Sequence, residues 1–301
     1  MNTLSDGGAG AADTLIGLQG NDTYLVNNTG TIVTEAAAGG SDTITSSVTY
    51  SLSVGSEIEF LQTSSAAGTG AINFTGNILA QTITGNAGVN TLSDGGAGAA
   101  DTLVGLAGND VYVVNNTGTV ITEAAASGSD TVQTSVNYVL AAGVEVETFT
   151  TTNGAGTGAL NLTGNAFAQS ITGNAGVNFI DGKDGNDVLA GGQGSDTFVF
   201  TTALNATTNL DTISDFGTTI GTNDDQFQLA TAIFTTLGAT FTAADFVANA
   251  TGAITNAAQN IIYNTATGAL FYDADGITGG SIQFATLTGN PTLTFSDFSM
   301  I

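Results

Sequence analysis

The chain has no cysteine, no histidine and no tryptophan, and it has a single proline in 301 residues. Without cysteine it cannot use disulfides to hold its folded state together. Without histidine or cysteine it lacks the usual zinc ligands, and also the side chain that most often serves as a general base near neutral pH. No H-E-x-x-H motif and no phosphate-binding loop followed by lysine occurs. We therefore expect a protein that is not an enzyme.

Positive charge is almost absent. Lys183 is the only basic residue against 26 acidic ones, for a net charge of −25, so salt bridges cannot neutralise the chain. Two carboxylates about 4 Å apart repel by about 4 kcal/mol at an effective dielectric constant of about 20, so closely stacked acidic side chains require a bound cation. The same sign of charge argues against nucleic acid and anionic membrane surfaces as partners.

Long apolar runs are also absent. No stretch approaches the roughly 18 apolar residues that a transmembrane helix needs, so we expect no membrane insertion. The first ten residues have neither a basic start nor an apolar core, so we expect no cleaved signal peptide. In contrast, glycine occurs 42 times and the mean hydropathy is positive, at +0.24, which excludes a disordered acidic tail. This composition predicts an all-β protein of short apolar strands separated by glycine-rich turns.

The clearest motif is a run of four nine-residue units, each opening with glycine: GNAFAQSIT (164–172), GNAGVNFID (173–181), GKDGNDVLA (182–190) and GGQGSDTFV (191–199). The sixth positions are polar and the eighth are apolar. The sixth positions hold Gln169, Asn178, Asp187 and Asp196, and the eighth hold Ile171, Ile180, Leu189 and Phe198.

This spacing predicts a stack of half-coils. Glycine reaches positive φ without steric cost, so the first six residues can turn the chain, and the next three form a strand whose middle side chain points inward. Units two apart then stack about 4.8 Å from one another, with Asp187 over Gln169 and Asp196 over Asn178. Stacked turns of this kind offer carboxylate and carbonyl oxygens, the hard ligands of which Ca²⁺ takes about six to eight.

The G-G-x-G-x-D-x-U-x pattern resembles the nonapeptide repeat of the RTX family of secreted bacterial proteins. The resemblance implies a right-handed parallel β-roll or β-solenoid with calcium in its turns. We therefore expect Ca²⁺ as the ligand of the glycine-rich turns. The candidate ligand residues are Asp187, Asp196, Gly182, Asp184, Gly185, Gly191, Gly194, Asn178, Asp13, Asp22, Asp101 and Asp110.

Alternative roles compete with calcium binding at several of these positions. The aspartates would serve as turn caps if they bonded backbone N–H groups instead. Gln169 and Asn178 bring an amide oxygen without charge, so we expect their sites to be weaker or empty. Asp42 and Asp130 lie in GSDT segments without the motif's glycines, and we interpret them as turn residues rather than ligands. The paired glutamates of the spacers, Glu57 with Glu59 and Glu145 with Glu147, lack the cleft that glycosidase chemistry requires.

An internal duplication organises the first 200 residues. NTLSDGGAGAADTL begins at Asn2 and again at Asn90, and the related NFIDGKDGNDVL begins at Asn178, so the modules repeat every 88 residues. Each complete module joins RTX-like turns to a spacer rich in Val, Ile, Thr and Tyr, which favours strands. We expect the spacers to form wider coils of one solenoid over residues 1–200; the alternative is that they form separate loops. Residues 2–5 match the end of a nonapeptide, so we expect this end either to stack on another subunit or to continue from a longer protein.

The repeats stop after residue 200, and residues 201–301 predict a different, mostly antiparallel β domain. Residues 261–273 have the length of a β-hairpin, and 241–250 predict one helix with Thr242 as its N-cap. This region resembles the C-terminal domains of type I-secreted RTX proteins, including serralysin-like proteases. Their uncleaved export signal ends much as Asp297–Ile301 does. The resemblance implies a capping and secretion domain, with the type I secretion apparatus as a partner.

Together these features predict a secreted calcium-binding structural protein of a surface layer, filament or extracellular matrix, located outside the cell or at its surface. It would fold and assemble as a homo-oligomer when it meets extracellular calcium, with cell-surface polysaccharide as a further partner. Two alternatives remain open. The chain could be the carrier and export module of a larger secreted enzyme, or an adhesin that binds glycans or ice through outward threonine and asparagine ladders.

Overall fold

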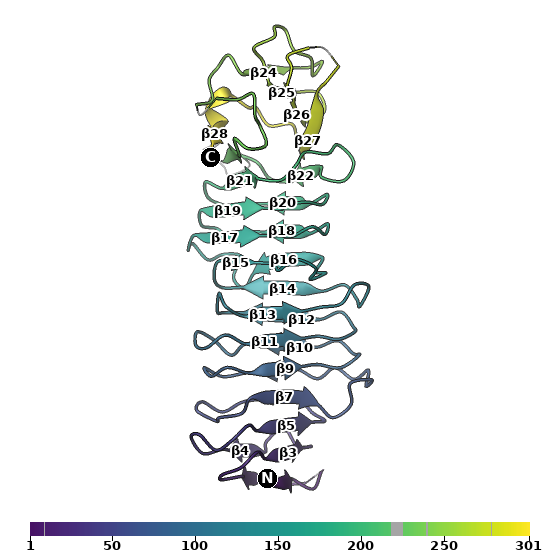
Figure 1. Cartoon of the computed structure of the whole chain (residues 1–301), viewed down its shortest axis with the longest axis vertical. Coiled ribbons are helices and arrows are strands. Elements are labelled where there is room, and N and C mark those ends of the chain that lie inside the picture. Colours follow the sequence, from purple (N-terminus) through teal and green to yellow (C-terminus); the bar gives the residue numbers. More distant parts are fainter. Residues whose placement is uncertain (9, 218–224, 239, 278) are drawn as a thin grey trace. The chain divides into compact units, whose positions relative to one another are not determined.

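The computed structural model describes residues 1–8, 10–217, 225–238, 240–277 and 279–301 (Figure 1). Within these residues the regular elements are β-strands and one 3₁₀ helix, and no helix has the length and hydrophobicity needed to cross a bilayer. The chain divides into two compact units, which we describe one at a time. The first contains Met1–Val136 and Gly143–Thr148, and the second contains Asn137–Ala142 and Phe149–Ile301.

The first unit is a parallel β-solenoid in which successive strands alternate between sheets. One sheet contains β1 (Thr3–Ser5), β3 (Thr23–Val26), β5 (Thr43–Ser46), β7 (Phe60–Thr63), β9 (Thr82–Thr84), β11 (Thr102–Val104) and β13 (Val120–Thr122). The strands between them are β2 (Thr14–Ile16) with β4 (Ile32–Thr34), and then β6 (Tyr50–Ser51), β8 (Phe74–Thr75), β10 (Thr91–Ser93), β12 (Val111–Val114) and β14 (Thr131–Thr134). Each coil therefore contributes one strand to each side.

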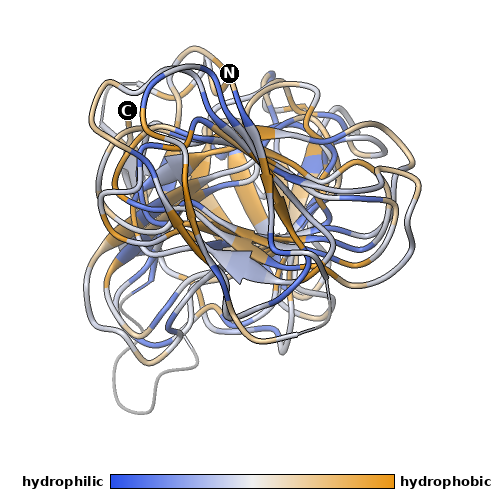
Figure 2. Ribbon diagram, turned by 90° about the horizontal axis from the view of Figure 1, so that it is seen from below, coloured by the Kyte–Doolittle hydropathy of each residue, from blue (hydrophilic) through white to orange (hydrophobic). Residues whose placement is uncertain are grey.

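The core of this unit is built from the middle residue of each strand, as the period of two predicts. These residues pair in register from one coil to the next and are at most 3% exposed, and they form the column Tyr24, Ile44, Leu61, Ile83, Leu103 and Ile121. Each fully buried Leu or Ile stabilises the stack by about 1.5–3 kcal/mol. In Figure 2, hydrophobic stretches run along the central strands, whereas the peripheral turns have mixed hydropathy.

The first spacer forms coils of the same solenoid as the repeats beside it, as predicted, and not a separate loop. Its strands β5 and β7 pair in parallel with each other, and β7 pairs with β9 of the next repeat block. Coil length changes along the stack. Thr3 pairs with Thr23, 20 residues later, whereas in the spacer Thr43 pairs with Phe60, 17 residues later, and Tyr50 with Phe74, 24 residues later.

Consecutive copies of the 88-residue module lie on different sides of the first unit. Thr23 of the first copy begins β3, and its counterpart Val111 begins β12, nine strands later and in the other sheet. Because two strands make one coil, a module contains an odd number of half-coils. Equivalent residues of successive modules therefore alternate between the two sides.

The second unit continues with parallel strands and ends in a mixed sheet. Its first sheet contains β15 (Tyr138–Val139), β17 (Leu160–Thr163), β19 (Asn178–Asp181), β21 (Thr197–Phe200), β23 (Gln226–Leu229) and β28 (Phe298–Met300). The other strands are β18 (Ser170–Thr172), β20 (Val188–Ala190), β22 (Asp211–Ile213), β27 (Ile282–Leu287), β26 (Ala269–Tyr272), β25 (Ile261–Asn264) and β24 (Phe246–Asn249). β16 (Thr148–Thr151) lies where the division between the units falls.

The fold class is confirmed, and the hairpin predicted over 261–273 is present as β25 and β26. The sheet at the C-terminus is nevertheless mixed rather than mostly antiparallel: β25–β26 and β26–β27 are antiparallel, whereas β22–β27 and β24–β25 are parallel. In the other sheet, β28 pairs with β23 in parallel. β22 and β23 lie beyond residue 200 but stack in parallel on β20 and β21, so coiling extends further than the repeats do.

The helix predicted over 241–250 is wrong. Thr242 and Asp245 do form a local cap, because the Thr242 N–H donates to the Asp245 carboxylate at 2.8 Å. From Phe246 the chain instead extends as β24, pairs with β25, and packs the Phe246 ring 5.4 Å from Phe298. The predicted cap is therefore present, but sheet pairing and aromatic packing outweigh the local helical preference.

Candidate metal-binding turns

The four nonapeptides from Gly164 to Val199 form stacked half-coils of the second unit. Ser170 pairs with Val188, and Phe179 with Thr197, so units two apart lie in register. The predicted stacking of the sixth positions is confirmed: Asp187 Oδ1 accepts a hydrogen bond from the Gln169 N–H at 2.7 Å, and Asp196 Oδ1 accepts one from the Asn178 N–H at 2.8 Å. One carboxylate oxygen of each aspartate therefore caps the adjacent coil.

We call this arrangement, in which a carboxylate accepts a hydrogen bond from the backbone of the preceding coil, an acidic ladder. The same ladder occurs in the first unit. Asp101 Oδ1 accepts from the Gln81 N–H at 2.6 Å, and Asp110 Oδ1 accepts from the Asn90 N–H at 2.7 Å. Asp22 Oδ1 accepts from the backbone N–H of Asn2. The turn-capping role considered for these aspartates is thus real, but it uses only one of the two oxygens.

The second oxygen of these aspartates is buried without a hydrogen-bond partner. Among the residues described, the buried and unpartnered carboxylate oxygens are the Oδ2 atoms of Asp22, Asp42, Asp101, Asp110, Asp187 and Asp196. All six side chains are at most 1% exposed. An ionised oxygen in such a place is strongly destabilising unless a cation neutralises it, because it has lost water and gained no donor. Six carboxylates are therefore set up in the same way to receive a positive charge.

In the last two nonapeptides the first glycine makes room for the unpartnered carboxylate oxygen. A methyl group on Gly182 would lie 2.2 Å from Asp187 Oδ2, and one on Gly191 would lie 2.2 Å from Asp196 Oδ2. The glycine at the fourth position reverses the chain with a positive φ of 115° at Gly185 and 116° at Gly194. Carboxylate oxygens beside open backbone are the donor set that Ca²⁺ prefers. The predicted residues thus fit a calcium ion.

In units with an amide at the sixth position, that side chain instead hydrogen-bonds to a residue of its own turn. Asn178 Oδ1 accepts from the Asn174 N–H at 2.7 Å, and Asn178 Nδ2 donates to Asn174 Oδ1 at 3.1 Å. Gln169 makes the same ring with Asn165, and Gln81 makes it with Asn77. Because the side-chain amide here has protein partners for both its oxygen and its nitrogen, these turns need no cation. This agrees with the expectation that the amide sites are weak or empty, and it makes Asn178 a weaker candidate ligand than Asp187 or Asp196.

Burial raises the pKa of the ladder aspartates, because the charged form has lost its water. The pKa of Asp187 rises from 3.8 to about 8, and those of Asp101 and Asp196 rise to about 7. Burial also raises the pKa of Asp110, to about 6. Without a cation, burial therefore shifts all four groups toward the protonated form, and Asp187 the most.

This shift predicts how the calcium-free protein depends on pH. Each raised carboxyl binds its proton more tightly in the folded chain than in the unfolded one, where the pKa is about 3.9. The stabilisation is therefore complete below about pH 4 and is lost as the pH rises through about 7 to 8. In a chelator, the melting temperature followed by circular dichroism should fall from pH 4 to pH 8. With calcium the trend should reverse, since ligands must ionise to bind it. A melting temperature independent of pH in the chelator would contradict this.

Two predicted ligands lie outside this arrangement. Asp184 is exposed on its turn, and Asp13 is exposed although its counterpart Asp101 is buried. Asp101 is covered by the coil that carries Gln81. Asp6 and Asp94, also beside glycine turns, have their carboxylates occupied by protein donors. For example, Asp94 Oδ2 accepts from the Asn115 N–H at 2.6 Å.

Several acidic residues that join the ladders were not among the predicted ligands. Asp42 Oδ1 accepts from the Asp22 N–H and Asp130 Oδ1 from the Asp110 N–H, both at 2.7 Å. Glu59 and Glu147, the second members of the glutamate pairs, extend these ladders by accepting from the Asp42 and Asp130 N–H groups. Asp211 and Asp225 do the same above Asp187 and Asp196. The number of residues between each of these side chains and its partner varies, so only the stacking of the coils in the structure shows that they join the ladders.

A family model for the RTX calcium-binding nonapeptide repeat, in four copies, matches residues 6–24, 75–112 and 163–198. No curated protein and no solved structure matches the chain. The matched segments contain all six aspartates predicted from the motif: Asp13, Asp22, Asp101, Asp110, Asp187 and Asp196. The spacers lie outside the match, although they form coils of the same kind. The three matched segments therefore carry the RTX nonapeptide repeat, and the coils of the spacers lie between them.

Proposed function

We propose that this chain is a secreted structural protein that binds calcium outside the cell, coils as it does so, and assembles into a surface layer, filament or matrix. The observation that carries the proposal is the set of buried aspartate oxygens without donors, at glycine-lined turns that match the calcium-binding repeat. Calcium at about 10⁻⁴–10⁻³ M, the range suited to extracellular modules, would neutralise them. In the cytosol, where calcium is scarce, carboxylate repulsion would keep the chain open.

The C-terminal segment supports export before folding. β28 pairs with β23, and Phe298 is 6% exposed and stacks on Phe227 with ring centroids 5.0 Å apart. The Ile301 carbonyl also accepts from the Thr231 N–H. A type I exporter that reads this segment would therefore have to engage the unfolded chain.

Assembly is supported by exposed apolar residues in the first unit. Ile16 and Ile32 lie on β2 and β4 and are 53% and 51% exposed. The adhesin alternative would need a regular outward threonine ladder, but the column through Thr23 and Thr43 is interrupted by Phe60.

Electron microscopy of the purified full chain, with millimolar calcium and with a chelator, tests this function. We expect ordered filaments or sheets with calcium and none in the chelator. An Ile16→Ser, Ile32→Ser variant should bind calcium normally but assemble less. Particles that stay monomeric at every calcium concentration, while calcium is bound, would overturn the structural role and favour the carrier-module alternative.

A further inference from the structure

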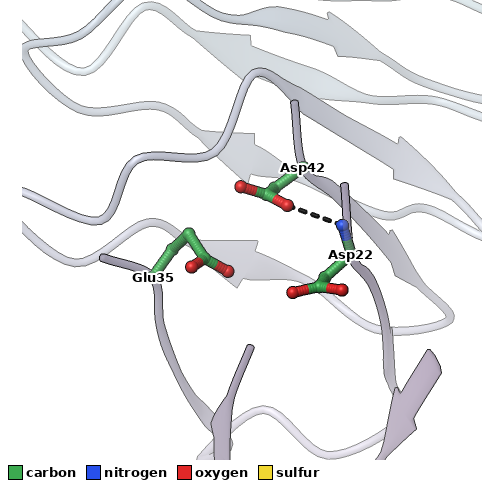
Figure 3. A group of neighbouring side chains, drawn as sticks. All are labelled: Asp22, Glu35 and Asp42. Atoms are coloured by element: carbon green, nitrogen blue, oxygen red, sulfur yellow. Dashed lines mark hydrogen bonds between the residues drawn. The ribbon is translucent and has the colours of Figure 1, made fainter. Parts of the chain in front are cut away.

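Each of the first two modules buries a glutamate of its spacer against two aspartates. The first carboxylate cluster is Asp22, Glu35 and Asp42, and the second is Asp110, Glu123 and Asp130. In each cluster one oxygen from every residue lies within 4.8 Å of the others, and all six side chains are buried. Figure 3 shows the carboxylates of Asp22 and Glu35 facing one another, with Asp42 beside them. Both glutamates lie outside the segments that match the nonapeptide model.

Strand register brings the glutamate to this place. Ile16 of β2 pairs with Thr34 of β4, so the next residue along, Glu35, lies beside Gly17. A methyl group on Gly17 would lie 2.5 Å from Glu35 Oε2 and 2.6 Å from Asp22 Oδ2. Gly105 has the same relation to Glu123 and Asp110, at 2.6 and 2.3 Å. In both copies the oxygens thus converge on the open face of the repeat's first glycine.

The clusters have too few donors for their charge. Asp22 Oδ2, Asp42 Oδ2 and Asp110 Oδ2 are buried without a partner. Glu35 Oε2 and Glu123 Oε2 each accept a hydrogen bond from a buried tyrosine hydroxyl, of Tyr24 and Tyr112 respectively. Their Oε1 atoms accept from the backbone N–H groups of Ala36 and Ala124, and that of Glu123 also accepts from the Ser127 hydroxyl. The N-terminal ammonium lies 3.7 Å from Asp22 Oδ1, but in the second cluster the corresponding Asp110 oxygen accepts from the Asn90 backbone N–H. Lys183 is committed elsewhere, 2.9 Å from Asp181.

The chain contains its own comparison for this arrangement. In the two modules with a cluster, the eighth position of the nonapeptide is tyrosine, Tyr24 or Tyr112, and its hydroxyl reaches the glutamate. In the third repeat block, residues 164–199, that position is Phe198, and the ladder continues from Asp196 to Asp225 on the next coil. Tyrosine and the spacer glutamate therefore occur together, at the two junctions where a nonapeptide turn meets a complete spacer.

We propose that each cluster binds one hard cation, Ca²⁺ in the native setting, through the two aspartates and the spacer glutamate. The site differs from a turn made of nonapeptides alone, because a residue outside the repeat completes it and because three carboxylates surround the ion. It clamps the spacer coil onto the repeat coil. The inference rests on the proposed function only in taking calcium as the ion.

Terbium luminescence tests the clusters in the full chain. A Tb³⁺ ion held by Glu35 or Glu123 lies next to the tyrosine that bonds the same carboxylate, so exciting tyrosine should produce terbium emission. We expect this emission to saturate at two ions per chain and to be displaced by calcium. Glu35→Gln with Glu123→Gln should weaken binding at these two sites by more than the roughly 10- to 100-fold that loss of an outer-shell partner costs, and should remove the emission, with two fewer ions bound in equilibrium dialysis.

Two variants make the result decisive. Tyr24→Phe with Tyr112→Phe keeps every carboxylate, so it should bind the same number of ions while losing the emission. If the glutamine variant fails to fold, this pair decides: emission retained without both tyrosines overturns the proposal. Asp187→Asn with Asp196→Asn should leave the emission intact while removing ions from the third block; normal ion binding by this variant counts against the proposed function and not against the clusters. A wild-type chain that binds Tb³⁺ without tyrosine-sensitised emission overturns the inference.

Discussion

Removing calcium at neutral pH should unfold the coils. Two ionised carboxylates within 4.8 Å repel by at least about 3 kcal/mol at an effective dielectric constant of about 20. The two clusters alone contain six such pairs, whereas a folded domain is stable by only about 5–15 kcal/mol. Protonating a carboxylate relieves this repulsion but is itself unfavourable at pH 7.5, because the same group has a pKa of about 4 in the unfolded chain. Either cost opposes folding without calcium. Far-UV circular dichroism in a chelator at pH 7.5 should report a largely unfolded chain, and millimolar calcium should restore the β signal.

The specificity of this effect can be checked with monovalent salt. Sodium chloride at matched ionic strength screens exposed charges but reaches buried pairs much less, so it should not replace calcium. Magnesium should also restore less structure, because it demands a smaller octahedral site and gives up its water reluctantly. A β signal that is unchanged by chelation at pH 7.5 would contradict calcium-driven coiling.

Filling the glycine space should abolish the sites of the third block. Gly182→Ala and Gly191→Ala each place a methyl group 2.2 Å from an aspartate Oδ2, without demanding an unusual backbone, because neither glycine has a positive φ. The carboxylate must rotate away, which breaks its hydrogen bond to the N–H of Gln169 or Asn178 on the preceding coil. We expect a loss of about 2–4 kcal/mol per site in the calcium-bound state, from overpacking and from a buried N–H left unpaired. Calorimetric titration should detect fewer bound ions.

Gly158→Ala is the matched control, because a methyl group there would have no atom within 4 Å and the residue has no positive φ. Its ion count and stability should match those of the native chain. Should the Gly182 and Gly191 variants bind as many calcium ions as this control, the space beside Asp187 and Asp196 is not where calcium binds.

The repeat part of the fold can be predicted from the sequence because its geometry is local. Nine residues make half a coil, so the contact between Asp187 and Gln169 can be derived by counting. The spacers defeat such counting, because Thr43 pairs with Phe60 and Tyr50 with Phe74, at offsets set by loop length rather than by a motif. Glu35 meets Asp22 only through that register. The only sequence signal for Glu35 is that it recurs as Glu123 one module later. The residues on either side of it recur in the same way, so the recurrence does not single out the glutamate.

In the C-terminal region, the sequence predicts the elements formed by local contacts but not those formed by distant ones. The hairpin of β25 and β26 is predictable because its turn and both strands lie within one short segment. β24 is not, since its strand conformation depends on pairing with β25 and on contact between Phe246 and Phe298, which are far apart in the sequence. The cap formed by Thr242 and Asp245 is present as predicted, but a cap alone does not determine whether the next residues form a helix or a strand.

The odd number of half-coils in each module has a consequence for how such a gene can change. Inserting or deleting one copy by recombination would exchange the two sides for every later strand, so any surface presented on one side would be presented on the other. Two copies gained or lost together would leave that orientation intact. Lineages that lengthen this protein while preserving a one-sided contact should therefore do so by pairs.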